Sequence, residues 1–93
     1  MSLIDATQAN IRTTLENVVR DIGHVARNDP KFNEHTELFD SGYIGSLGIV
    51  SLTAYIEQEF DITLTEEDLF DPKFTTIDGI AEIIAARTRG NSA

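Results

Sequence analysis

The chain has 93 residues, and its 16 Asp and Glu against 7 Lys and Arg give it a formal net charge of −9. That length allows one small domain with a modest core, built from the 41% of residues that are hydrophobic. The acidic balance argues against binding to nucleic acid or to an anionic membrane, because both attract basic surfaces.

The residue types that the chain lacks exclude several kinds of site. The chain has no cysteine, which excludes disulfides and thiolate metal sites, and two histidines, His24 and His35, are too few for a histidine-rich metal site. No apolar run approaches the roughly 20 residues that cross a bilayer, and the first residues lack the pattern of a secretory signal. We therefore expect a cytoplasmic protein without a bound metal, a membrane partner or a nucleic-acid partner.

The first helix is expected from Asp5 to Arg27, with Asp5 or Thr7 as its N-cap. The sequence NDP at 28–30 predicts its end, because proline disfavours helical conformation in the residue before it. Its apolar residues recur at spacings of three and four, which places these side chains on one face: Ile11, Leu15, Val18, Ile22 and Val25.

A loop from Pro30 to Ile44 should follow, attached to the core by Leu38, Phe39 and Ile44. A second helix is expected to begin near Gly45 and Ser46. Its core-facing residues step by three and four: Ile49, Leu52, Ile56 and Phe60. A neighbouring stripe, partly exposed, consists of Leu47, Val50 and Ala54.

Two capping patterns predict the remaining helices. Residues 65–68 (TEED) place an acid three residues after a capping threonine and open a short helix that ends before Asp71 and Pro72. Residues 75–78 (TTID) open a last helix, whose C-terminal end carries Arg87 and Arg89. The apolar face of that helix consists of Ile77, Ile80, Ala81, Ile84 and Ala85, and residues 90–93 are expected to fray. The expected class is all-α.

Ser46 occupies the first turn of the second helix, directly after the long loop. Its hydroxyl would be exposed beside unpaired backbone N–H groups, where the helix dipole favours a phosphate. Serine is also a common helix-start residue, so its position alone leaves an ordinary structural serine open. A serine hydrolase is disfavoured, because the motif Gly-x-Ser-x-Gly needs glycine at position 44, which holds Ile.

The segment around Ser46 resembles the prosthetic-group site of acyl carrier proteins. Four pieces with the family's pattern follow in order: LFDSGYIGSLGIV (38–50), IEQEFDITL (56–64), EEDL (66–69) and TTI (75–77). The resemblance covers about residues 36–85. It implies an acyl-carrier-protein-like four-helix bundle with three main helices and one short helix, spanning residues 1–93 as a single carrier domain. The core would extend over about residues 5–88, and residues 89–93 would form the tail.

The resemblance also implies a function. A phosphopantetheinyl transferase would transfer 4′-phosphopantetheine from coenzyme A to the hydroxyl of Ser46. The thiol of that arm would then hold an acyl or aminoacyl group as a thioester. The chain would not be an enzyme. It would act as a monomer that receives its cargo from a ligase or acyltransferase and delivers it to downstream synthase enzymes.

Gly45 departs from the family pattern, in which the residue before the serine is nearly always an aspartate that assists the transferase and its metal ion. No acid occurs between Asp40 and Glu57, so the first half of the expected docking helix is neutral. Around it, residues 32–72 contain ten acids and no Lys or Arg, a charge that favours basic partner surfaces. We expect partners to contact Gly45, Leu47, Val50, Ala54, Glu57, Glu66 and Glu67.

The residues around Ser46 also bear on the kind of carrier and on whether Ser46 is modified. The string FDSGYIGSLGIV (39–50) looks like free-standing D-alanyl and related aminoacyl carriers, which favours a dedicated carrier over a general fatty-acid carrier. The glycine at position 45 leaves an alternative open: an unmodified carrier fold that acts only as a protein-binding module.

Overall fold

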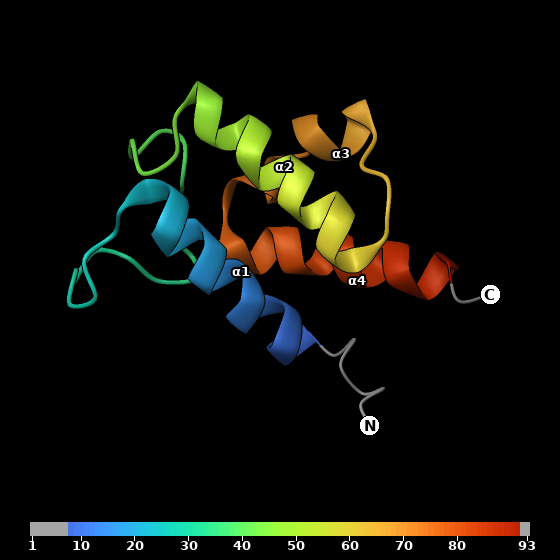
Figure 1. Cartoon of the computed structure of the whole chain (residues 1–93), viewed down its shortest axis with the longest axis horizontal. Helices are drawn as coiled ribbons and strands as arrows, with labels where there is room; N and C mark the ends of the chain where they lie inside the picture. Colours follow the sequence, from blue (N-terminus) through green and yellow to red (C-terminus); the bar gives the residue numbers. More distant parts are fainter. Residues whose placement is uncertain (1–7, 92–93) are drawn as a thin grey trace.

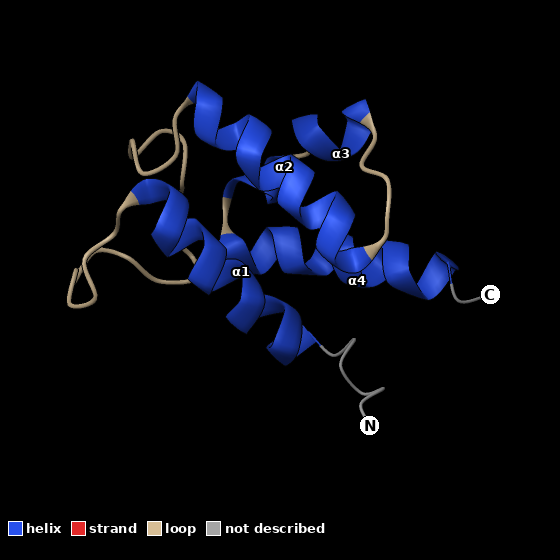
Figure 2. Ribbon diagram, viewed as in Figure 1, coloured by secondary structure: helices blue, strands red, loops and turns tan. Residues whose placement is uncertain are grey.

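The computed structural model describes residues 8–91, and every regular element among them is helical (Figure 1, Figure 2). The elements are α1 (Gln8–Gly23), α2 (Ser46–Phe60), α3 (Glu66–Phe70), the 3-10 helix η2 (Pro72–Thr75) and α4 (Ile77–Asn91). This arrangement confirms the predicted all-α class with three main helices and one short helix. The 3-10 helix was not predicted.

One hydrophobic core joins α1, α2 and α4 with the connecting segments. α1 packs against both α4 and α2, and the Arg12–Asp78 ion pair (2.9 Å) links α1 to the start of α4. The buried residues are Ile11, Leu15, Val19, Phe32, Leu38, Ile44, Leu52, Ile56, Ile62, Leu64, Phe74, Ile77, Ile80, Ala81, Ile83, Ile84 and Ala85. They include the whole predicted face of α4, which is therefore confirmed.

α1 ends at Gly23, earlier than the predicted end at Arg27. His24 adopts a left-handed conformation with φ of 52°, and the N–H of Val25 donates to the carbonyl of Arg20 at 2.9 Å. This is the Schellman closure, which usually places glycine at the left-handed position. Because histidine occupies that position here, the sequence did not reveal the end of the helix.

The N-cap and the core face of α1 differ in how far they can be compared with the predictions. Asp5 and Thr7, the expected N-caps, lie outside the described residues. The buried residue of the middle turn is Val19, whereas Val18, predicted on the core face, is only partly buried at its edge. Val25 still packs against the core, although it follows the helix.

The connection between α1 and α2 occupies residues 24–45 and is fastened to the core from within. Leu38 and Ile44 are buried and Phe39 is partly buried, as predicted. The N–H of Leu38 donates to the carbonyl of Thr75 at 2.8 Å, and the N–H of Ile44 donates to the carbonyl of Leu38 at 3.0 Å. These bonds hold the last part of the loop next to η2 and set where α2 begins.

α2 begins at Ser46 with Gly45 as its N-cap, as the sequence predicts, and ends at Phe60. Asp61, its C-cap, is left-handed with φ of 54°. Its predicted core face is confirmed. Leu52 and Ile56 are buried, and Ile49 and Phe60 are partly buried against the core.

The capping patterns of α3 and α4 are present. At α3, the N–H of Asp68 donates to Thr65 Oγ1 at 3.2 Å, and the N–H of Thr65 donates to Asp68 Oδ2 at 3.0 Å, which completes a capping box. At α4, the N–H of Gly79 donates to Thr76 Oγ1 at 3.0 Å. Gly79 is required there, because a Cβ atom would lie 1.9 Å from the carbonyl oxygen of Lys73.

The end of α4 differs from the prediction. Gly90 and Asn91, expected to fray, belong to the helix. Glycine lowers helix propensity by about 1 kcal/mol relative to alanine, but it keeps its N–H and so does not break the hydrogen-bond ladder. Ser92 and Ala93 lie outside the described residues.

Leu52→Ala should destabilise the folded chain by about 2–5 kcal/mol, because it leaves a cavity in the core. Leu47→Ala is the matched control on the same helix: its side chain is 85% exposed, so the free energy of unfolding should change by no more than about 0.5 kcal/mol. Urea unfolding followed by circular dichroism measures both values. Equal effects of the two substitutions would contradict the assignment of the buried face of α2.

Candidate functional site

Ser46 is the first residue of α2, and its side chain is exposed. Within residues 8–91 its hydroxyl has no hydrogen-bond partner. The structure thus places the hydroxyl of Ser46 where the sequence predicts it, at a helix start and open to solvent. An enzyme that transfers a group to this oxygen meets no local bond that it would first have to break.

The N-terminus of α2 has no side-chain cap. Gly45 supplies none, and the first bond of the helix runs from the N–H of Ile49 to the carbonyl of Gly45 at 2.9 Å. In the described part of the chain, the N–H groups of Leu47 and Gly48 have no acceptor. Free N–H groups and the positive end of the helix dipole together favour a phosphate at this point. The residues therefore fit a phosphate group bonded to the hydroxyl of Ser46.

Gly45 is not required by the backbone. Its φ is −94°, in the extended region that any residue adopts, and a Cβ atom at this position would meet no atom within 4 Å. Space for a larger N-cap is present, so the missing carboxylate reflects the choice of residue and not a steric limit.

A family model described as phosphopantetheine attachment site matches residues 13–84. The chain belongs to this family. Members of the family carry a 4′-phosphopantetheine prosthetic group and are carriers, not enzymes. No curated protein and no solved structure matches the chain significantly, so the resemblance to D-alanyl carriers stays a prediction.

Within residues 8–91, no group of three or more His, Asp or Glu side chains is placed to hold a metal ion. None of the helices in that range combines the length and apolar character needed to cross a bilayer.

The loop before Ser46 is held by a group of side chains from both of its ends. The hydroxyl of Tyr43 donates to Asp29 Oδ2 at 2.7 Å, and the ring of Tyr43 meets the edge of Phe32 with centroids 5.3 Å apart. The guanidinium of Arg20, on α1, lies 4.7 Å above the ring of Phe32. These contacts tie the last residues before α2 to the end of α1.

Gly23 contributes to the same attachment by its small size. A Cβ atom at Gly23 would lie 2.6 Å from the carbonyl oxygen of Tyr43. Because contacts under 3.0 Å require something to shift, a larger residue would push the chain before Ser46 away from α1. The glycine that marks the end of α1 thus also fixes the approach to α2.

Five of the seven predicted partner-binding residues fall into two groups, and Gly45 is exposed just before α2. Leu47, Val50 and Ala54 are exposed on one side of α2, with Leu47 85% and Val50 64% exposed, and Glu66 and Glu67 are exposed on α3. The first group follows Ser46 along the same side of the helix, as spacings of three and four residues require.

Glu57 has a structural contact that the sequence did not suggest. Its Oε2 accepts a hydrogen bond from the N–H of Leu64 at 3.0 Å, and its side chain is half-buried. The carboxylate therefore fastens the loop between α2 and α3 to α2.

Sequence reasoning missed Phe70. At 83% exposure it is one of the four large hydrophobic residues that the described chain leaves exposed, with Leu47, Val50 and Leu69. All four lie on α2 or α3. The helix that carries Phe70 has five residues, which is too short for an apolar periodicity to separate an exposed side from a buried one.

Tyr43→Phe should raise the pKa of Asp29. The hydrogen bond from Tyr43 lowers the pKa of this carboxyl below its usual value, with a further contribution from the N–H of Lys31. A lowered pKa means that the carboxylate stabilises the folded chain above its ordinary pKa, a contribution lost as the pH falls through the lowered value. NMR titration of the Asp29 carboxyl measures the change. Tyr55→Phe, the control, removes the other tyrosine and should leave the pKa of Asp29 unchanged.

Proposed function

We propose that the chain carries an acyl or aminoacyl group as a thioester on a 4′-phosphopantetheine arm attached to Ser46. The observation that carries this proposal is the exposed hydroxyl of Ser46 at the uncapped start of α2, inside the segment that matches the family model. When bound, the arm supplies the thiol that forms the thioester. The chain itself has no cysteine.

The residues of the chain have supporting functions at this site. The N–H groups of Leu47 and Gly48 would hold the phosphate, and the helix dipole would stabilise its negative charge. The hydrogen bond between Tyr43 and Asp29 keeps the preceding loop in place while a partner docks. No side chain acts as an acid or a base, because the chemistry takes place in the active sites of the partners.

The partners follow from the proposed carrier function. A phosphopantetheinyl transferase would load the arm, a ligase or acyltransferase would load the cargo, and synthase enzymes would receive it. Each would contact Gly45, Leu47, Val50, Ala54, Glu57, Glu66 and Glu67. The exposure of Phe70 supports its inclusion in the same surface. The complementary surface has an apolar recess for these side chains and basic groups opposite Glu66 and Glu67.

The cargo and the setting are further parts of the proposal. The likeness of residues 39–50 to aminoacyl carriers supports a dedicated carrier, with an aminoacyl group as the favoured cargo. A location in the cytoplasm agrees with the supply of coenzyme A there. A monomer suits a carrier that must bind several enzymes in turn through one surface.

Incubation with coenzyme A and a broad-specificity phosphopantetheinyl transferase should increase the intact mass by one phosphopantetheine arm. Ser46→Ala should remove the whole increase, because no other hydroxyl has the same place at the start of α2. Ser51→Ala is the matched control, since Ser51 is exposed on the same helix but away from its N-terminus, and it should be modified like the wild type. A wild-type chain that several transferases leave unmodified would contradict the proposal.

Gly45→Asp should accelerate the modification and stabilise the fold. The new carboxylate would cap α2 and interact with its dipole, which adds about 0.3–1 kcal/mol to the free energy of unfolding. It would also restore the acid found before the serine in the resembling carriers. Initial rates of mass increase and thermal melting measure the two effects, and Gly45→Asn, which caps without a charge, should reproduce most of the stabilisation but not the faster modification.

The glycine at position 45 supports a second candidate, a carrier fold that binds partners without modification. Intact mass spectrometry of the chain purified from its own cells separates the two candidates. Modified protein supports the carrier function. Wholly unmodified protein that is recovered in a stable complex supports the binding module.

A further inference from the structure

α3 is attached to the domain in an unusual way, because none of its side chains is buried. The nearest core residues flank it: Leu64 precedes the helix and Phe74 follows it in η2. These two residues hold the ends of the segment. They leave the orientation of α3 between them to be set by other contacts.

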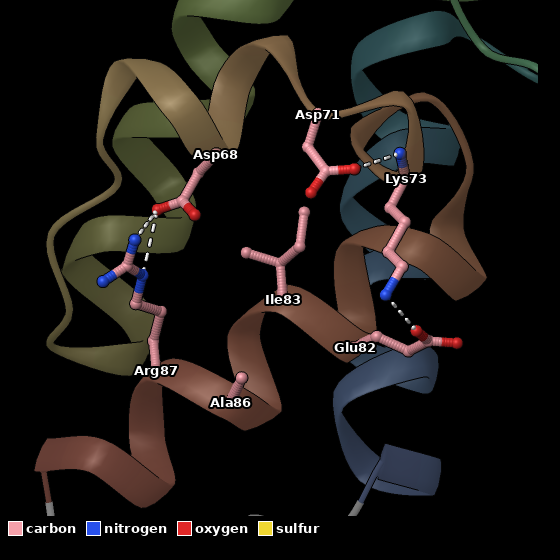
Figure 3. Close-up of a pocket in the computed structure, with 7 residues that line it drawn as sticks. All are labelled: Asp68, Asp71, Lys73, Glu82, Ile83, Ala86 and Arg87. Atoms are coloured by element: carbon pink, nitrogen blue, oxygen red, sulfur yellow. Dashed lines mark hydrogen bonds and ion pairs between the residues drawn. The ribbon is translucent and has the colours of Figure 1, made fainter.

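One such contact comes from α4. Asp68 Oδ2 accepts hydrogen bonds from Arg87 Nε at 3.0 Å and forms an ion pair with Arg87 Nη2 at 2.7 Å (Figure 3). The same Nη2 donates to Thr65 Oγ1 at 3.3 Å. The guanidinium of Arg87 therefore bonds to both residues of the capping box at the start of α3. We call Arg87 and Asp68 the α3 latch.

The latch lies at one side of a pocket between α3, η2 and α4. Figure 3 shows Ile83 and Ala86 of α4 between the latch and a second ion pair, Lys73–Glu82, at 3.3 Å. The Asp68 side chain is 13% exposed, against 39% for Arg87. The bond from Arg87 lowers the pKa of Asp68 below its usual value, as expected for a carboxylate held in its charged form.

The α3 latch also affects which side chains of α3 are exposed to a partner. Three acids occupy the first turn of α3. Arg87 pairs with Asp68, whereas Glu66 and Glu67 are exposed. The same ion pair holds α3, whose last residue, Phe70, is 83% exposed. A helix whose backbone is already held in place costs less to order on binding, so its exposed aromatic side chain can act as an anchor.

We propose that Arg87 is a positioning residue, which fixes α3 and thereby presents Phe70 to the apolar recess of a partner enzyme. The inference rests on the proposed function, because the partner is an enzyme that acts on the arm. Arg87 acts through Asp68, from a helix on which the sequence predicted no functional residue.

The first test is amide hydrogen exchange of the full chain, resolved by NMR. Arg87→Met keeps the aliphatic stem and should speed exchange of the Leu69 and Asp71 amides by about threefold or more, as expected for loss of a partly exposed ion pair. Arg12→Met is the matched control: it breaks the Arg12–Asp78 pair, in which the arginine is 38% exposed, and should leave these amides unchanged. Unchanged exchange in Arg87→Met, or an equal rise throughout α4, overturns the proposal.

The second test is the modification of Ser46, with a broad-specificity transferase and coenzyme A as the probe. Phe70→Ser and Arg87→Met should each raise KM for the chain by about threefold or more with little change in kcat, and the double variant should be no worse than Phe70→Ser alone. Arg87→Lys, which keeps the charge but not the forked geometry, should restore part of the loss. Additive effects, or unchanged KM values, overturn the proposal. If either result is found while Ser46 is still modified, the positioning proposal fails but the proposed carrier function stands.

Discussion

The one-sided burial of α2 is the constraint on which the rest of the structure depends. Leu52 and Ile56 are held in the core, so the opposite side of the helix, with Ser46 at its start, must face solvent. A helix that is apolar on more than one side normally becomes buried all round. Here the core covers one side only, with α1 packed against it, and Leu47 and Val50 are left exposed.

Two polar contacts, one in the loop before α2 and one at the α3 latch, hold the segments next to the exposed side of α2. The first fixes the start of α2 through Tyr43 and Asp29, and the second fixes α3 through Arg87 and Asp68. In both cases a polar contact between distant parts of the chain determines where an exposed residue lies. The apolar core makes the domain stable, whereas these contacts orient its surface.

Much of the fold could be predicted because it follows from local patterns. The apolar spacing of α1, α2 and α4, the capping box of Thr65 and Asp68, and the start of α2 at Ser46 are all encoded within a few residues of one another. The end of α1 was predicted too late, because His24 takes a conformation that a non-glycine residue seldom adopts. The latch joins residues 68 and 87, and no local pattern reports such a pairing. The exposure of Phe70 was equally out of reach, since it depends on how α3 lies against α4.

The pairing of α1 with α4 has a consequence for the life of the molecule in the cell. The Arg12–Asp78 contact joins parts of the chain 66 positions apart, and α4 supplies six of the buried core residues, from Ile77 to Ala85. A growing chain on the ribosome therefore cannot cover α1 until α4 has emerged. The core is therefore complete only once α4 has been synthesised, and until then α1 lacks the helix that covers most of its buried face.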